Sequence, residues 1–429
     1  MHIRYFCWIL SMLTAAAILI ELAGCGKRTD NRVQSTKSCT TETANPILSA
    51  QVLQKPKDWP LTEFQVHLLD LAFEAATLIP VPPFAKDRSL AQEKVVETCL
   101  QLHQPVRAIR YADQIGDWRR GLCYAKTAFY LAGQGYGAEY VQPGLDLAEQ
   151  IARMDHGQQW RNDRIRAKIA QTDLLLGKIE QAEQIGRQIE DSEAAVLMQT
   201  RIQAEAGDLF DEQIKQLDAL VALLNFDITQ SALHAYAGLF DRYYDNPQRR
   251  ALTEERIKVA WGKLPIPIRL EVLKKLAQSA LDHGDSDKAI DLFRQADEYL
   301  NPCLWPLENY LPLSAEWIEI QYKAGNVEQA RTNADALRSM VDQKGEGIID
   351  IYRARAIIPL ARAYHTIGDP ETALTIYKQA VEAGMVNPNK RPRAEDLSSI
   401  CCSMAQDGIQ PDAELWARMQ QILKELGSE

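Results

Sequence analysis

The sequence lacks the spacings that most catalytic and metal sites require. Its seven histidines include no His-Glu-x-x-His stretch, and its eight cysteines include no Cys-x-x-Cys pair, so zinc and thioredoxin-type sites have no support. The only glycine cluster, residues 133–137, lacks the spacing that cradles phosphates. No serine stands in a nucleophile-elbow sequence. We therefore expect no catalytic residue, no metal and no cofactor.

The chain also lacks an excess of positive charge and any strand pattern. The chain has 48 Lys and Arg against 58 Asp and Glu, a net charge of −10, which argues against nucleic acid as the main partner. Glycine and proline gather at turns, which argues against wholesale disorder. From Leu61 onward the apolar residues follow helical periods, and no alternation typical of strands interrupts them. We expect an all-α protein.

The N-terminus has the pattern of a targeting segment. An apolar run from Tyr5 to Ile20 is shorter than the ~20 residues that a membrane-spanning helix needs. Residues 22–25 read Leu-Ala-Gly-Cys and resemble the lipobox of bacterial lipoprotein signal peptides at all four positions. The resemblance implies cleavage before Cys25 and lipidation of this cysteine, which would anchor the chain to a membrane. The alternative is an uncleaved membrane helix from Ile3 to Leu22.

Composition divides the rest of the chain. We predict a signal peptide over residues 1–24 and a lipidated cysteine with a polar, flexible tether over 25–57, which reaches roughly 30 Å from the membrane. An N-terminal solenoid over 58–263 and C-terminal repeats over 264–429 follow, with a joint at the proline-rich residues 264–267. The expected location is the inner or outer bacterial cell membrane, with the body facing the periplasm or the exterior.

Residues 357–381 show the repeating unit most clearly. Four apolar residues at i, i+3, i+4 and i+7 form one face of a helix: Ile357, Leu360, Ala361 and Tyr364. Gly368 predicts a left-handed stop, Asp369 a helix cap and Pro370 the first position of the next helix. The second helix has an apolar face of its own, made of Ala373, Leu374, Tyr377, Ala380 and Val381. This pattern predicts a helical hairpin.

The hairpin recurs at a regular interval. The turn glycines follow one another at a nearly constant spacing, and each has an alanine five positions later: Gly284, Gly325, Gly368 and Gly408. A fixed period of this size, roughly 40 residues, is typical of solenoids. The residues that carry a family resemblance are Ala277, Gly284, Ala289, Phe293 and Ala296, and then Leu360, Ala361, Tyr364, Gly368, Ala373, Tyr377 and Ala380.

In these positions the chain resembles the tetratricopeptide repeat, over about residues 118–426. The period here exceeds the usual repeat length of that family, which is about 34 residues, and the tryptophan of its first helix is mostly absent. The resemblance implies a right-handed α-solenoid of helical hairpins, with a concave groove that binds peptides or proteins.

The repeat's groove positions can be carried over to three units. The partner-binding residues that this predicts are Lys274, Gln278, Glu319, Tyr322, Lys323, Arg355, Arg362 and His365. Arg355 and Arg362 would clamp a carboxylate of the partner bidentately. The alternative is that these side chains are surface charges that pair with neighbouring helices.

These features favour a membrane-anchored lipoprotein scaffold that binds an envelope protein or peptide, with an oligomeric state that the sequence leaves open. The alternative is a helical glycan-binding lipoprotein of an outer-membrane uptake system. That function would use exposed aromatic rings near the inter-repeat loops, and the candidates are Trp160, Trp305 and Tyr310.

The cysteines leave one question open. Cys99 and Cys123 lie on neighbouring predicted helices, and an exported compartment permits a disulfide between them. The alternative is burial as small apolar residues, which is common for free cysteines.

Overall fold

A computed structural model describes residues 56–154, 156–189, 197, 200–201, 207–262 and 264–428. The predicted signal peptide, Cys25 and nearly all of the predicted tether lie outside the described residues. Residues 44–429 form one compact unit, and everything below concerns that unit. The proposed division of the solenoid at residue 264 stays a prediction.

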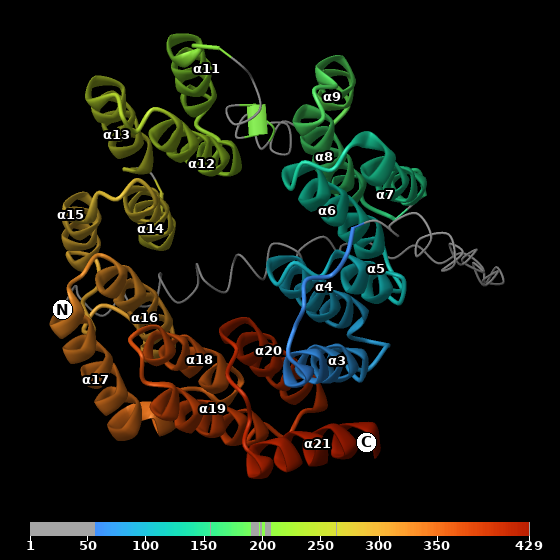
Figure 1. Ribbon diagram of the computed structural model, residues 1–429, viewed down its shortest axis with the longest axis vertical. Coiled ribbons are helices and arrows are strands. Elements are labelled where there is room, and N and C mark those ends of the chain that lie inside the picture. Colours follow the sequence, from blue (N-terminus) through green and yellow to red (C-terminus); the bar gives the residue numbers. More distant parts are fainter. Residues whose placement is uncertain are drawn as a thin grey trace, which may run out of the picture. The chain divides into compact units, whose positions relative to one another are not determined.

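All regular secondary structure in the described residues is helical, which confirms the predicted fold class (Figure 1). The helices in chain order are α3 (Glu63–Thr77), α4 (Ala85–Gln101), α5 (Pro105–Ala112), α6 (Arg119–Gly133), α7 (Ala138–Ala152), α8 (Gln159–Leu175), α9 (Ile179–Gly186), α11 (Phe210–Ala222), α12 (Phe226–Arg242), α13 (Pro247–Trp261), α14 (Ile266–Asp282), α15 (Ser286–Asp297), α16 (Leu307–Lys323), α17 (Val327–Lys344), α18 (Asp350–Thr366), α19 (Pro370–Met385), α20 (Lys390–Asp407) and α21 (Ala413–Ser428), with a 3-10 turn at Gly345–Gly347.

The predicted turn between α18 and α19 is confirmed in detail. Gly368 has a φ of +83°, which glycine adopts without the steric cost of a Cβ. The amide of Asp369 donates to the carbonyl of Tyr364 at 2.9 Å, which closes the end of α18. The Asp369 side chain then accepts from the amide of Thr372 at 3.0 Å and caps α19, whose first residue is Pro370. The first helix of this pair therefore ends, and the second begins, where the sequence predicts.

No turn glycine precedes helix α5, so the glycine marker of the predicted hairpins does not indicate this helix. The turn before α5 uses His103 at a φ of +56°, the left-handed position that a glycine takes in turns such as those at Gly284 and Gly368. Ala108 stands five residues after His103 and is fully buried, like Ala289, Ala330 and Ala373 after their turn glycines. The helix is capped from a distance, because the Asp58 carboxylate accepts from the amide of Val106 at 2.8 Å.

The helix pairs form a row that does not begin at the N-terminus. In an ordinary pair such as α18 and α19, the first helix packs on its own second helix and on the first helix of the next pair, and the second helix also packs on that next first helix. Helix α20 makes its extensive contact with α3 instead of α21, and both α20 and α3 pack on α4. The N-terminal α3 therefore serves as the second helix for the C-terminal α20 (Figure 1). We call α20 with α3 the composite pair.

Side chains join the two ends of the chain within the composite pair. The side-chain amide of Gln65 on α3 donates at 2.8 Å to the backbone carbonyl of Ala405 on α20, although 340 positions of sequence separate the two residues. One hydrophobic cluster contains Leu68 and Leu69 from α3 together with Leu397 and Ile400 from α20, and all four are fully buried. Helix α21 packs on both members of the pair. The row thus continues from α20 through α3 to α4 without a break in the core.

None of the helices in the described part of the chain is long and apolar enough to cross a membrane.

Candidate functional site

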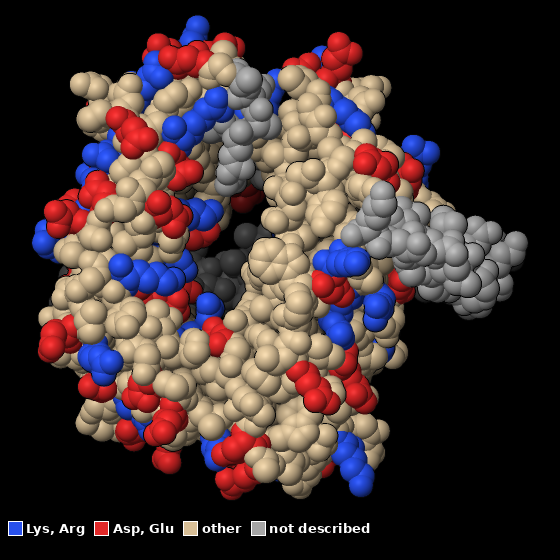
Figure 2. All heavy atoms as spheres, viewed as in Figure 1, with Lys and Arg blue, Asp and Glu red and all other residues tan. Residues whose placement is uncertain are grey.

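Charged side chains link the first helices of neighbouring pairs. Lys274 on α14 pairs with Glu316 on α16 at 2.7 Å, and Arg362 on α18 pairs with Asp407 on α20 at 3.4 Å. Arg119 on α6 is buried and pairs with Glu93 on α4 at 2.9 Å, which repeats the pattern beyond the composite pair. Acidic and basic side chains are accordingly interspersed over the face in Figure 2. Ion pairs therefore lie between the first helices of neighbouring pairs.

Arg355 contacts the most deeply buried carboxylate of this set. Its guanidinium, on α18, donates to Asp396 at 3.1 Å and to Glu395, both on α20. Burial opposes the charge of Arg355, but the two carboxylates outweigh it and raise the pKa of the guanidinium. Asp396 is fully buried, and burial raises its pKa to about 7 against the opposing effect of Arg355. One oxygen of Asp396 has no hydrogen-bond partner among the residues that the structure describes.

The other predicted partner-binding residues occupy three neighbouring first helices. Glu319 on α16 lies near Arg362 and Lys323, and burial raises the pKa of its carboxyl against the effect of both cations. Lys323 is exposed in the last turn of α16, and Tyr322 packs on the hydrophobic core. The structure brings these residues together with Arg362 and Lys274. The remaining two lie one turn further along the same helices: Gln278 follows Lys274 on α14 and donates to Asp282, and His365 follows Arg362 on α18.

These contacts bear on the predicted carboxylate clamp. Both Arg355 and Arg362 already hold carboxylates of α20, so a carboxylate from a partner would have to compete with them. The pairs match the alternative interpretation, in which these arginines join neighbouring helices. Binding of a partner by the eight predicted residues stays a prediction.

The aromatic rings of the glycan alternative pack against other residues. The Trp305 indole donates to the carbonyl of Tyr299 at 2.8 Å, and Tyr310 packs on the hydrophobic core. The Trp160 ring meets the Trp118 ring edge-on, at 5.4 Å and 82°. The three candidate rings therefore do not form an exposed coplanar platform.

The cysteine question has a clear answer within the described residues. Cys99 and Cys123 are free, and both are fully buried. Burial raises the pKa of both thiols, so they stay protonated and behave as small apolar residues.

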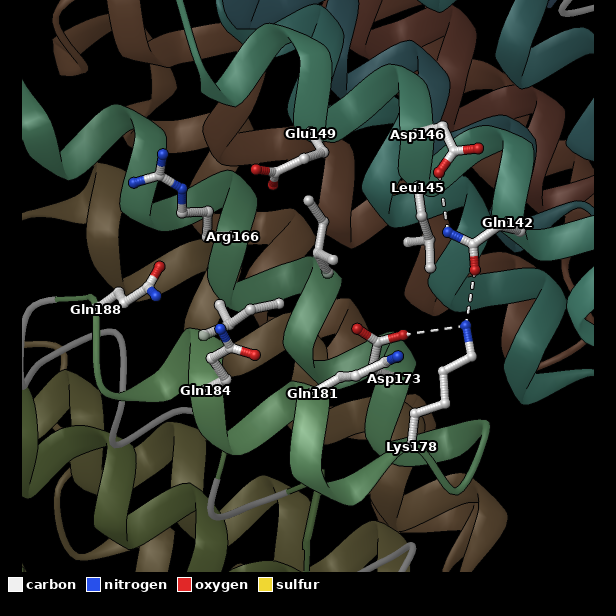
Figure 3. A pocket seen from close by; sticks show the side chains of 12 residues that line it. Gln142, Leu145, Asp146, Glu149, Arg166, Asp173, Lys178, Gln181, Gln184 and Gln188 are labelled. Carbon is white, nitrogen blue, oxygen red and sulfur yellow. Dashed lines mark hydrogen bonds and ion pairs between the residues drawn. The ribbon is translucent and has the colours of Figure 1, made fainter.

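A cavity of about 350 Å³ lies between α7, α8 and α9, away from the predicted residues. Lys178 spans one end of it, donating to Gln142 at 2.7 Å and lying 3.6 Å from Asp173 (Figure 3). Burial raises the pKa of Asp173, and the ammonium of Lys178 opposes this shift. The residues that line the cavity are Gln142, Leu145, Asp146, Glu149, Arg166, Ile169, Asp173, Lys178, Gln181, Gln184, Ile185 and Gln188.

Sequence reasoning missed this cavity, although a signal was present. Gln181, Gln184 and Gln188 follow the i, i+3, i+7 spacing that places side chains on one helix face. A polar face of this kind is ordinary on an exposed helix. The sequence did not show that α7 stands across from it and leaves space between.

Comparisons with known proteins add little to this picture. No protein-family model and no curated protein matches the sequence. Among solved structures, a chain described as "Circular tandem repeat protein with novel repeat topology and enhanced subunit contact surfaces" is similar at 14% identity and a TM-score of 0.27, over 85% of this chain and 95% of that chain. The fold and the sites described above rest on the contacts of this chain alone.

Proposed function

We propose that this protein is a lipid-anchored, non-enzymatic scaffold of the bacterial cell envelope, which binds a protein or peptide partner through its helical repeats. The observation that carries the proposal is the continuous row of helix pairs from α12 through the composite pair to α9. Stacked repeats of this kind offer extended surfaces that suit protein–protein contact. The sequence motifs of common catalytic sites are absent, which fits a binding role.

The anchoring part of the proposal rests on the Leu-Ala-Gly-Cys sequence at residues 22–25. A lipoprotein with two or three acyl chains stays on a membrane where one chain would not hold it. The test is labelling of growing cells with an alkyne-bearing palmitate analogue. We expect the intact protein to incorporate the label and the Cys25→Ser variant to lose it, together with its membrane fraction. Equal labelling of both would contradict the anchor.

The partner part needs variants that leave the helix packing intact. Arg355→Glu would place a third carboxylate beside Glu395 and Asp396, which would destabilise the fold. A loss of partner binding in this variant could therefore come from unfolding as well as from a lost contact with the partner. Lys323 is exposed and offers a cleaner position. A photo-crosslinking residue at position 323 in intact cells should give a discrete adduct with one envelope protein. We expect that the adduct disappears when Gln278→Lys is combined with the crosslinker at position 323. The melting temperature of this variant should stay unchanged, which shows that it is still folded. If Gln278→Lys leaves the adduct intact, the first helices are not the binding surface.

A further inference from the structure

The connections between helix pairs lie along one edge of the row. The helices of a pair run antiparallel, so the end of each second helix and the start of the next first helix share this edge, which we call the connection edge. The turns inside the pairs, such as the turn at Gly368, lie along the opposite edge, which we call the turn edge. Most of the large hydrophobic side chains that are exposed in the described residues lie at the connection edge, in or beside six different connections: Met154, Leu224, Val259, Leu304, Ile349 and Val386.

The connection between α11 and α12 is the most apolar part of this edge. Its Leu223, Leu224 and Phe226 are 60%, 67% and 49% exposed. Residues 219–226 contain no charged side chain. On the turn edge, by contrast, the exposed hydrophobic residues stand singly, as Ile179 does. The apolar surface of the row is therefore concentrated on one edge, with its maximum at this connection.

Leu224 is held in its exposed position with backbone strain. Its φ of +57° lies in the left-handed region, which a residue with a Cβ adopts unfavourably. His103 has a similar φ, but its ring bonds to the Tyr130 hydroxyl and stacks on Trp59. The side chain of Leu224 is exposed and gains no comparable contact in the described part of the chain. Asn225 fixes the turn, because its side chain caps α12. The turn thus displays apolar side chains that the fold itself does not require.

The distribution of these side chains favours a lipid bilayer over a protein partner. Neighbouring helices in such a row lie about 10 Å apart, so each connection presents an apolar point of its own. Protein interfaces have a contiguous, closely packed apolar core, which this edge lacks. A bilayer is fluid and takes up each apolar side chain separately, at the boundary between headgroups and acyl chains. A chain that contacts a bilayer in this way needs no membrane-spanning helix.

Charge agrees with this orientation. The turn edge carries aspartates that cap second helices, such as Asp285 and Asp369. At the connection edge, Arg153 and Lys258 are exposed next to two of the apolar side chains, and Asp227 is exposed at the α11–α12 connection. The charge of the connection edge is therefore mixed, while carboxylates recur along the turn edge. An anionic bilayer is repelled less by the connection edge.

We propose that the connection edge rests on the surface of a lipid bilayer, and that the α11–α12 connection inserts Leu223, Leu224 and Phe226 among the headgroups. The inference rests on the proposed lipid anchor, which would hold the chain at a membrane, and it adds the orientation in which the helical row meets that membrane. The exposed surfaces of the first helices would stay open to a protein partner.

The test uses the environment-sensitive fluorophore NBD, attached through Leu224→Cys to the full-length protein in vesicles of equal parts phosphatidylethanolamine and phosphatidylglycerol. Cys303 is exposed and Cys39 lies outside the described residues, so both are replaced by serine to prevent labelling there. We expect the NBD emission to shift to shorter wavelength, with quenching by a nitroxide-bearing lipid and little quenching by aqueous iodide. The matched control is NBD at Ile179→Cys, an exposed aliphatic position on the turn edge, which should keep its emission in water and its quenching by iodide.

A second variant tests the neighbouring side chains. Leu223→Ser with Phe226→Ser, added to the chain labelled at position 224, should reduce the emission shift, because the apolar area that enters the bilayer becomes smaller. Both side chains are exposed, so the melting temperature should stay unchanged, and its measurement checks that the variant is folded. An emission shift that this variant leaves intact would contradict insertion of the connection.

Two further outcomes would overturn the inference: emission at position 224 that stays as in water, or equal signals at positions 224 and 179. Flotation with the vesicles judges the anchor separately. If the protein floats while position 224 stays in water, only the orientation is wrong. If the protein does not float, the anchor is wrong, and titration of the labelled protein with the same vesicles still decides whether position 224 enters the bilayer.

Discussion

Asp396 gives the sharpest prediction, because a fully buried carboxylate with one unpaired oxygen must respond to pH. Its Oδ1 accepts from Arg355 at 3.1 Å, while its Oδ2 lies against Gly384 of α19, where an added Cβ would come within 3.3 Å. Burial raises its pKa from the ordinary 3.8 to about 7 in the folded protein. Between these two values the folded state holds a proton that the unfolded state has released. Stability should therefore fall as pH rises through this window.

The magnitude follows from the two pKa values. Their difference is 7 − 3.8, about 3 units, and each unit corresponds to about 1.4 kcal/mol. The full effect is then about 4 kcal/mol, present below pH 3.8 and lost above pH 7. In Asp396→Asn the neutral amide keeps the shape of the protonated acid and its acceptor for Arg355. The stability of the variant relative to the wild type should thus rise by about 2–3 kcal/mol between pH 5 and pH 8.

The assay is urea unfolding followed by far-UV circular dichroism at pH 5 and pH 8. Other carboxyls, such as Asp173 and Glu319, also titrate with a raised pKa, so only the difference between variant and wild type reports on Asp396. Asp297→Asn, at an exposed position on α15, is the control and should show no such change. A stability difference between Asp396→Asn and wild type that is the same at both pH values would refute the reasoning.

The remaining predictions concern the repeat and its ends. Gly368→Ala should lower the free energy of unfolding by about 1–2 kcal/mol through backbone strain alone, because nothing lies within 4 Å of the added Cβ. Thermal melting checks this, and Gly368→Asn should be the milder variant. Asp369→Ala should lower the free energy of unfolding by about 1 kcal/mol, because it removes the cap of α19. Unchanged stability would mean that the cap does not stabilise the helix. Leu69→Ala on α3 should lower the free energy of unfolding by about 3 kcal/mol, because Leu69 is fully buried. Amide hydrogen exchange should then become faster in residues 394–407 of α20. Unchanged exchange in these residues would argue against the composite pair.

The helical hairpins were predictable because their signals are local. Gly368, Asp369 and Pro370 each act on the backbone within a few residues, and the structure keeps all three roles. Where a different residue performs the same task, the pattern fails. His103 takes the left-handed position before α5, and sequence spacing gives no reason to expect a histidine there.

The composite pair was beyond the reach of such reasoning. The small, buried Ala72 and Ala76 of α3 show that a neighbour packs closely, but they do not say which neighbour. Periodicity describes one helix at a time, and the partner of α3 comes from the other end of the sequence.

The candidate sites were predictable to a different extent. The repeat pattern placed Arg355 and Arg362 on the same helix, and the structure has both in contact with α20. Their carboxylate partners come from the next first helix, which sequence spacing does not identify. The cavity on α8 depends on the distance between α7 and α9, and that distance is a property of packing.

The most direct test of the architecture is the melting temperature of a chain that begins at residue 85 and so lacks α3, measured with and without a synthetic peptide of residues 56–78. The account predicts that this chain melts well below the full-length protein and that an excess of the peptide restores most of the loss. A truncated chain that melts at the full-length temperature, with no response to the peptide, would contradict it.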